Sequence, residues 1–411
     1  MKKALKNIGP GLLYAAAAIG VSHLVQSTRA GASYGITLLI VVILANILKF
    51  PFFEYGPRYA AATGKNLIEG YKKLGSWAIA VFLIMTFGTM FVIQAAVTVV
   101  TAGLAERLFL FINEMQAWNI SGIILIICLS ILLFGKYYLL DRIIKVIVSV
   151  LAITTIFALF FASFSLGDKE LIGSFSFSDT SDIAFLIALV GWMPAPLDLS
   201  VWHSVWSLAK RSSENEKINL KEALLDFKIG YWGTAFLAIC FLLLGAFVMY
   251  GTGEELSSKG TVFAGQLIEL YTTTIGKWSF WIIAIAAFTT MFSTTLTCLD
   301  AFPRVLSKTC TALIPSLSFN KNNKKLYWFW NLFVSTGTMV ILTFYLKNMG
   351  TLIDFITTIS FLTAPAFAIM NYMVINGNDV PNEFKPGKTK KIISWLGILF
   401  LVGFGVFYLV S

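Results

Sequence analysis

Charged residues are scarce in this sequence. They make up 13% of its 411 residues, whereas soluble globular domains contain roughly 25%. The shortage arises from long uncharged stretches, including 36–48 and 395–410, and the mean hydropathy is +0.80. A membrane-spanning helix needs about 20 mostly apolar residues, and a backbone in lipid must satisfy its own hydrogen bonds. Because these stretches are long and do not alternate, we expect an all-α integral membrane protein.

Residues that bind metals or carry out catalysis are also few. The four cysteines include no pair with metal-ligand spacing, and the sequence contains two histidines and no nucleotide-binding motif. We therefore predict no enzyme activity, no catalytic residue and no resident cofactor. The net charge of +10 does not indicate a nucleic-acid partner, because the basic residues lie in short segments between apolar spans. No segment indicates an obligate protein partner, so the expected partners are a small inorganic ion and the lipid bilayer.

The apolar stretches divide into eleven predicted transmembrane helices. They cover about 10–32, 35–54, 76–102, 119–135, 143–165, 183–207, 226–250, 276–300, 326–346, 351–376 and 393–410. With a cytoplasmic N-terminus, the inner connections contain 24 Lys and Arg residues and the outer connections contain 6. Positive residues concentrate on the cytoplasmic side of membrane proteins. We therefore predict a multi-pass protein of the inner (plasma) membrane with its N-terminus inside and its C-terminus outside.

The first and sixth predicted helices are interrupted at mid-depth. The first passes through Gly-Val-Ser-His at 20–23, and the sixth contains two prolines within 191–196, which remove backbone donors. Matching interruptions five helices apart indicate an inverted five-plus-five repeat with the substrate site at the breaks. We predict a single transporter domain over 1–411, with repeats at about 10–165 and 183–376 and one extra helix at about 393–410.

The first two spans resemble a known family. The segment GPGLLYAAAAIGVSHLVQSTRAGASYG at 9–35, the loop RYAAATGK at 58–65, and Met193-Pro194 followed by His203-Ser204 are similar to NRAMP-type divalent metal transporters. This resemblance implies a LeuT-type fold. It also implies a secondary active transporter that works by alternating access around a site between helices 1 and 6.

The metal-binding motif of that family is replaced in this sequence. The family's Asp-Pro-Gly-Asn run falls on 20–23, so Gly20 takes the place of the metal-binding aspartate and His23 that of the asparagine. A second family aspartate, linked to proton coupling, falls on Ser27. The Met-Pro-His run of helix 6 has become Met-Pro-Ala at 193–195. These differences predict the family's scaffold without its metal chemistry.

A small anion suits the residues at the breaks better than a divalent cation. A cation that loses water needs oxygen, nitrogen or sulfur ligands, and the break in helix 1 offers no carboxylate. A broken helix exposes N–H groups with a partial positive charge, which favour an anion. We predict bicarbonate as the leading candidate, although nitrite, formate and acetate remain open. The predicted substrate-binding residues are Gly20, Val21, Ser22, His23, Gln26, Ser27, Trp192, Met193, Pro194, Ala195 and Pro196, with Arg29 at the entrance.

Ion coupling has candidates in helices 8 and 6. In LeuT-type transporters a sodium ion often lies between carbonyls of helix 1 and hydroxyls of helix 8. The resemblance therefore implies a candidate Na⁺ site at Gly20, Ser293, Thr294 and Thr297. Asp198 is a candidate coupling acid, because an ionisable residue inside a membrane is a functional suspect. Proton coupling and uncoupled transport remain open.

Other interpretations remain open. The chain could transport a divalent metal ion, Mg²⁺ or Mn²⁺, through an atypical site that includes Asp198 and Met193, since partly hydrated ions need fewer direct ligands. A channel or a membrane enzyme is the third hypothesis. His23 and Asp198 could instead link neighbouring helices, and His203 is expected to be structural. We also expect i,i+4 pairs between Glu54 and Arg58 and between Asp300 and Arg304, and a gate shaped by Asp354 and Pro365.

Overall fold

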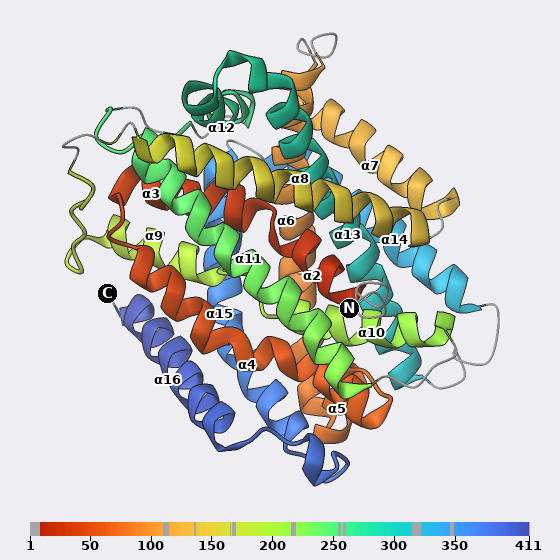
Figure 1. The fold of residues 1–411 in the computed structure, drawn as a ribbon. Coiled ribbons are helices and arrows are strands. Elements are labelled where there is room, and N and C mark those ends of the chain that lie inside the picture. The colour runs from red at the N-terminus through yellow and green to blue at the C-terminus, as the bar shows by residue number, and fades with distance from the viewer. Residues whose placement is uncertain are drawn as a thin grey trace.

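The protein is a bundle of long helices in the computed structural model (Figure 1). The structure describes residues 9–109, 115–134, 137–164, 166, 170–214, 219–253, 256–257, 260–314, 322–345 and 349–410. Within this part of the chain the only β pairing is an isolated bridge between Gly35 and Ile172. The architecture is therefore all-α, as the uncharged stretches predicted.

Each predicted span coincides with helical structure. The spans that follow the first are α4 (Leu39–Thr63), α6 (Ser76–Leu108), α7 (Ala117–Phe134), α8 (Tyr137–Phe164), α9 (Thr180–Gly191) with α10 (Leu199–Glu214), α11 (Leu220–Val248), α13 (Phe280–Leu313), α14 (Asn322–Val340) with η5 (Ile341–Tyr345), α15 (Met349–Ile375) and α16 (Lys388–Val410). Among the described residues, eight helices are long and apolar enough to cross a membrane. The other three predicted spans are the broken first and sixth spans and α8, of which Val148–Phe164 forms the apolar part, so the number of crossings stays a prediction.

The first span consists of three helical pieces. Helix α2 covers Pro10–Ala18, the π-helix η1 covers Val21–Ser27, and α3 covers Thr28–Tyr34. The sequence predicted an interruption over 20–23, but the helix is broken only at Ile19 and Gly20 and then resumes with π geometry. π-Helical turns are rare and occur frequently at functional sites. The hydroxyl of Ser22 lies 2.5 Å from the Ala18 carbonyl oxygen and so bridges the break with a side-chain hydrogen bond.

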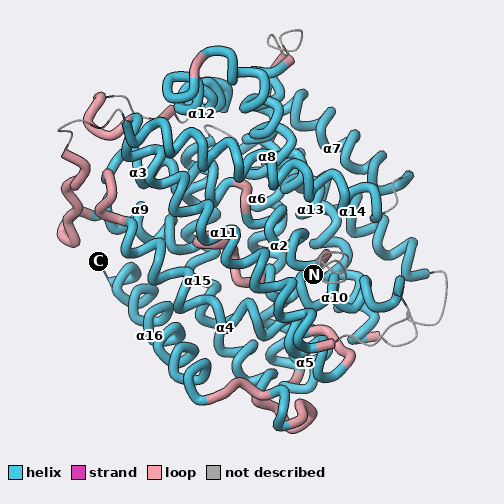
Figure 2. The backbone as a smooth tube through the Cα atoms, in the orientation of Figure 1, coloured by secondary structure: helices cyan, strands magenta, loops and turns pink. Residues whose placement is uncertain are grey.

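The sixth span is interrupted over a longer segment. Helix α9 ends at Gly191 and α10 begins at Leu199, with the two prolines in between. Neither proline can donate a backbone hydrogen bond, so the chain cannot continue as a helix through 192–198. Figure 2 shows loop segments of this kind inside the bundle and not only at its ends. Both interruptions predicted from the sequence are therefore present, while the repeat boundaries stay a prediction.

Small residues allow the broken first span to pack closely against α11. A Cβ atom at Gly31 would lie 1.9 Å from the Leu242 carbonyl oxygen, and one at Gly11 would lie 2.1 Å from the Asp226 carbonyl oxygen. Close backbone approach through glycine is a common way to pack helices in membranes. The carboxylate of Asp226 also accepts hydrogen bonds from the backbone N–H groups of Gly9 and Gly11, at 3.0 and 2.8 Å, and so caps the start of α2.

Several long helices extend beyond the apolar stretches that predicted them. Helix α4 continues to Thr63, nine residues past the predicted end at Glu54, and stops at Gly64, whose φ of 68° is left-handed. An apolar stretch identifies the part of a helix that is expected to lie in lipid. The helix can continue beyond that stretch where it packs against other parts of the protein. Two short helices lie between the long ones, α5 (Leu67–Leu74) and α12 (Gly260–Ile275).

The orientation prediction rests partly on residues outside the described part of the chain. These basic residues are Lys2, Lys3, Lys6, Lys136, Lys169, Lys217, Lys259, Lys321 and Lys347. In Figure 1, the C-terminal end of α16 lies on the same side of the bundle as the start of α9, and α5 lies on the opposite side. Which of these two sides faces the cytoplasm stays a prediction.

Candidate functional site between the two broken helices

A small cavity lies between the two interruptions. Its volume is about 20 Å³, which is room for about one water molecule. The lining residues come from the first span, α6, the break after α9, α10 and α13: Ala17, Val21, Ser22, Ile93, Val97, Trp192, Pro196, Leu199, Trp202, Thr294 and Cys298. The cavity therefore cannot hold a substrate of several atoms without movement of its walls.

The polar groups of the cavity wall are few and uncharged. They are the hydroxyls of Ser22 and Thr294, the thiol of Cys298 and the indole N–H of Trp192, which donates to Ser360 Oγ on α15 at 2.7 Å. No carboxylate lines this cavity. Groups of three or more His, Cys, Asp or Glu side chains that could hold a metal ion are also absent from the residues that the structure describes.

Ser22 connects the two breaks. Its hydroxyl oxygen lies 2.7 Å from His23 Nδ1 and 3.2 Å from the carbonyl oxygen of Pro194 in the break after α9. His23 Nε2 lies 2.9 Å from the carbonyl oxygen of Thr234 on α11. Because a carbonyl only accepts, Nε2 must carry the proton and donate. Both ring nitrogens of His23 are thus engaged, and the imidazole does not line the cavity.

Gly20 allows the broken helix to approach α13. A Cβ atom at this position would lie 2.7 Å from Thr294 Cγ2 and 2.9 Å from Thr294 Oγ1. The Thr294 hydroxyl donates to the Ala16 carbonyl oxygen of α2 at 2.8 Å. The position where the resembling family has an aspartate therefore has no room for a side chain in this conformation.

Lys49 is a residue of the site that the sequence reasoning missed. It lies in α4, is fully buried, and donates from Nζ to the carbonyl oxygens of Val190 and Gly191 at 2.5 and 3.1 Å. These are the last two residues of α9, where the regular helical hydrogen bonding ends at the break. The available signal was a basic residue inside an apolar span, which is rare and commonly functional.

Asp198 lies at the other end of the same break. It directly precedes α10, where a helix start favours a negative charge, and it is 5% exposed. Its Oδ1 atom has no hydrogen-bond partner among the described residues. The flanking residues Pro196 and Leu199 line the cavity, although Asp198 itself does not. The predicted coupling acid is thus adjacent to the site.

A polar network joins α3 and η1 of the first span to α15. Arg29 forms an ion pair with Asp354 at 2.6 Å and donates to Gln26 Oε1 at 3.0 Å. The Gln26 amide lies 3.3 Å from Asp354 Oδ1 and 3.4 Å from Thr357 Oγ1. The positive charge predicted at the entrance is therefore paired with Asp354 in this conformation, and a gate shaped by Asp354 and Pro365 stays a prediction.

The predicted site residues divide into two groups. Four of them, Val21, Ser22, Trp192 and Pro196, line the cavity. The others lie around it: Gly20, His23, Gln26, Ser27, Met193, Pro194 and Ala195, all of them buried. Their role in substrate binding stays a prediction. The cavity residues that the sequence did not single out are mostly apolar residues on α6 and α10, for which residue type offers no signal.

The candidate sodium residues also differ in their positions. Thr294 joins α13 to the first span through Ala16, close to Gly20. The hydroxyls of Ser293 and Thr297 donate within α13, to Thr290 and Ser293 carbonyl oxygens at 2.8 and 2.6 Å. The geometry thus brings Gly20 and Thr294 together, and the sodium site stays a prediction.

The pairs predicted to be structural are present. Arg58 and Glu54 form an ion pair at 2.7 Å, and Arg304 and Asp300 form one at 2.6 Å. His203 packs edge-on against Tyr14 and Phe227, in agreement with a structural role.

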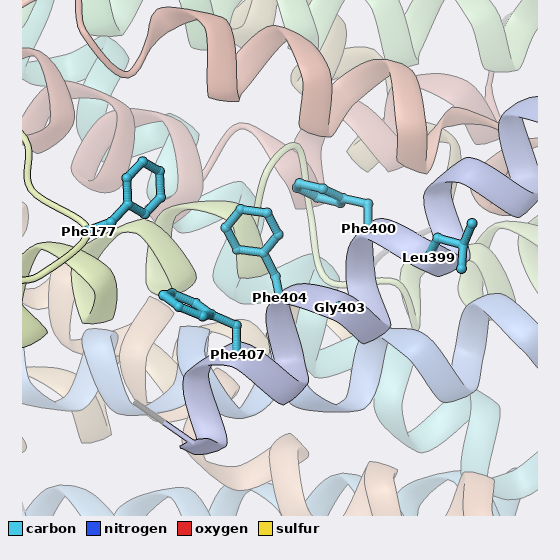
Figure 3. A pocket seen from close by; sticks show the side chains of 6 residues that line it. All are labelled: Phe177, Leu399, Phe400, Gly403, Phe404 and Phe407. Carbon is cyan, nitrogen blue, oxygen red and sulfur yellow. The ribbon is translucent and has the colours of Figure 1, made fainter.

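A second cavity of about 540 Å³ lies against α16, away from the breaks. Figure 3 shows its lining, which consists of Phe177, Leu399, Phe400, Gly403, Phe404 and Phe407. Because this lining contains no polar side chain, we assign it no part in ion transport.

Comparison with solved structures identifies the fold of this protein. The structure superposes on a mutant of the manganese transporter of Eremococcus coleocola with a TM-score of 0.72 and 14% identity, covering 98% of this chain and 86% of the other. It superposes on MhsT in complex with L-phenylalanine with a TM-score of 0.66 and 13% identity, covering 97% and 98%. At such identities the likeness establishes the fold, which is that of the LeuT-type transporters.

Sequence comparison establishes the family. The model of the natural resistance-associated macrophage protein-like (Nramp) family matches residues 11–411, and the chain belongs to this family of multi-pass membrane transporters. The uncharacterized protein PM0681 of Pasteurella multocida (strain Pm70) is 33% identical over 409 residues, covering 98% of this chain and 91% of that protein. The divalent metal cation transporter MntH of Latilactobacillus sakei is 23% identical over 288 residues, covering 67% and 60%. The resemblance noted in the first helix is thereby confirmed.

Proposed function

We propose that this protein is a secondary transporter that moves a small anion by alternating access, with bicarbonate as the leading candidate. The observation that carries the proposal is the composition of the cavity wall between the two breaks. It contains hydroxyl groups and no carboxylate, and the buried ammonium of Lys49 lies at the end of the adjacent half-helix. A dehydrated divalent cation needs several oxygen, nitrogen or sulfur ligands, whereas hydroxyl donors and helix starts suit an oxyanion.

The second candidate is a divalent metal ion such as Mn²⁺ or Mg²⁺. The names of the relatives favour it over the anion, since MntH is a divalent metal cation transporter and the superposed structure is a manganese transporter. One feature of the structure also supports it, namely the unpartnered carboxylate oxygen of Asp198 beside the cavity. A partly hydrated ion could use this oxygen together with the thioether of Met193 and backbone carbonyls.

The proposed transport cycle follows from the closed state of the site. The cavity holds about one water molecule, so substrate binding requires one side of the site to open. The Arg29–Asp354 pair closes the outer side, and the contact of Asp226 with the start of α2 holds the inner end of the first span. Opening these contacts in turn would expose the site to each side of the membrane.

Uptake into liposomes by the purified protein tests the proposal. Bicarbonate, Mn²⁺ and Mg²⁺ are offered in parallel at pH 8, each with and without a sodium gradient, and protein-free liposomes measure passive CO₂ leakage. Bicarbonate uptake without metal uptake would support the anion, and a sodium requirement would support the site at Gly20 and Thr294. Metal uptake alone would overturn the anion proposal in favour of the second candidate.

Two variants test where the transported ion binds and which kind of ion it is. We expect His23→Ala to abolish bicarbonate uptake, because it removes the imidazole that links Ser22 at the junction of the breaks to the Thr234 carbonyl of α11. Leaving buried polar groups unpaired costs about 1–3 kcal/mol, so folding is checked by size-exclusion chromatography. Asp198→Ala should be the more damaging change if a metal is carried. Normal transport by both variants would contradict this placement of the site.

A further inference from the structure

Lys49 occupies an unusual position for a basic residue. Its side chain is fully buried in the bundle, and its ammonium group donates to the carbonyl oxygens of Val190 and Gly191 at 2.5 and 3.1 Å. Burying a charge is costly unless it is compensated. The partners here are backbone dipoles, so the compensation comes from the end of α9 and not from an acid.

The end of α9 is suited to a cation. The twelve-residue helix Thr180–Gly191 ends at the break, where the partial negative charge of a helix C-terminus lies. In transporters built from broken helices, such half-helix ends and unwound carbonyls coordinate coupling cations. Here the cation at this end is an ammonium group that is covalently tethered to α4.

The carboxylates nearby do not neutralise this ammonium. Among the described residues, no acid forms an ion pair with Lys49. Three acids on α4 and on helices around it accept hydrogen bonds from other groups: Glu54 from Arg58, Asp182 from Tyr34, and Asp226 from Gly9 and Gly11. Asp198 is the last residue of the seven-residue linker that separates Gly191 from α10, and it forms no ion pair with Lys49. The side-chain amine of Lys49 therefore has no ion-paired acid within the described protein.

The end of α9 that Lys49 binds leads directly into the wall of the cavity between the breaks. Gly191 is followed directly by Trp192, which lines the cavity, and Gly191 packs so closely on α15 that a Cβ atom there would lie 2.0 Å from the Thr357 carbonyl oxygen. Because protein and lipid surround this region, water screens the charge only weakly. An anion in the cavity would be attracted, and a divalent cation would be repelled.

We propose that Lys49 determines the sign of the transported ion, by supplying the site with an ammonium charge that a bound anion stabilises and neutralises. This inference rests on the proposed function and names the residue behind its charge preference. Lys49 is not expected to touch the substrate. Its charge would act on the cavity from the other side of the end of α9. The competing explanation is that Lys49 only caps this helix and has a purely structural role.

Substitutions that separate charge from hydrogen bonding test the proposal. Lys49→Gln retains N–H donors for the two carbonyls and loses the charge, Lys49→Met loses both, and Lys49→Arg keeps the charge. The matched control is Lys72→Gln on α5, because Lys72 also donates to a backbone carbonyl, that of Ala312, but at the exposed inner face. Uptake of ¹⁴C-bicarbonate and of Mn²⁺ into proteoliposomes is measured for each, together with the melting temperature.

The expected result is a change in ion preference without loss of folding. Lys49→Gln should lower bicarbonate uptake by roughly tenfold or more and increase Mn²⁺ uptake relative to bicarbonate, while Lys72→Gln matches the unaltered protein and Lys49→Arg retains more uptake than Lys49→Gln. Bicarbonate uptake by Lys49→Gln at the unaltered rate would overturn the role of the charge. If Lys49→Gln and Lys49→Met do not fold, Lys49 is a structural cap and the proposal is also overturned. Mn²⁺ uptake without bicarbonate uptake by the unaltered protein would instead overturn the proposed function, and this inference with it.

Discussion

At the scale of single residues, Gly20 decides how closely the first span approaches α13. A Cβ atom at this position would lie 2.7 Å from Thr294 Cγ2, a distance that real Cβ atoms do not tolerate. We predict that Gly20→Ala destabilises the protein by about 1–3 kcal/mol and lowers uptake at least tenfold, because the break must shift away from α13. Thermal unfolding in detergent and uptake into liposomes measure the two effects.

Two further variants isolate the cause. Gly88→Ala on α6 is the matched control, because nothing lies within 4 Å of the added Cβ atom there, and it should transport normally. Thr294→Ser removes the Cγ2 atom but keeps the hydroxyl that donates to Ala16. The combination of Gly20→Ala with Thr294→Ser should regain part of the stability. Equal stability of the single and double variants would show that the contact with Thr294 is not the cause.

At the scale of elements, the Arg29–Asp354 pair joins α3 to α15 on the outer side. The two side chains are 23% and 43% exposed, so the pair contributes only about 0–1 kcal/mol to stability. Its expected role is to hold the closed state. We predict that Arg29→Gln and Asp354→Asn lower uptake to similar extents with little change in melting temperature, and that the swapped pair Arg29→Asp with Asp354→Arg regains uptake.

The same variants distinguish two roles: a gate formed by the Arg29–Asp354 pair, and attraction of anions by Arg29 at the entrance. If Arg29 mainly attracts anions, Asp354→Asn should raise uptake, because it leaves the guanidinium unpaired while Arg29→Gln removes the attraction. Opposite effects of the two variants would therefore contradict the gate. The initial uptake rate at low and high salt is the deciding measurement, since long-range attraction weakens with ionic strength.

A second link between elements holds the inner side together. Asp379, in the connection between α15 and α16, accepts hydrogen bonds from Lys73 on α5 and from Tyr59 on α4. Burial raises the pKa of Asp379, but these hydrogen bonds outweigh it and the pKa lies below the usual value. The stability that comes from this carboxylate is present above its unfolded-state pKa and is lost only as the pH falls through the lower folded value. A change in transport between pH 5.5 and 8 would therefore have to come from other groups.

At the scale of the whole molecule, the odd number of predicted spans places the two termini on opposite sides of the membrane. We predict that alkaline phosphatase fused after residue 411 is active in a bacterial host and that a fluorescent protein fused there is dark, because the C-terminus lies outside. Fusion of the fluorescent protein before residue 1 should give the reverse result. A fluorescent C-terminal fusion would mean that the number of crossings is even.

The class of structure and the position of the breaks could be predicted from local sequence alone. Uncharged stretches of about 20 residues leave the backbone no alternative to helices in lipid, and the two prolines of 191–196 exclude a continuous sixth helix. The residues GPGLLYAAAAIGVSHLVQSTRAGASYG indicated the family that comparison of the whole chain established. These are local properties, because each depends on the length, the composition or the order of neighbouring residues.

Which groups meet at the breaks depends on how the helices pack. His23 bonds to Thr234, 211 positions away, and Lys49 to Val190, 141 positions away, and no local pattern specifies either pairing. The sequence pointed to Arg29 as a free charge, but the crossing of α3 and α15 pairs it with Asp354. The net charge of the site depends on which side chains lie close together in space. It could therefore be determined only from the folded chain.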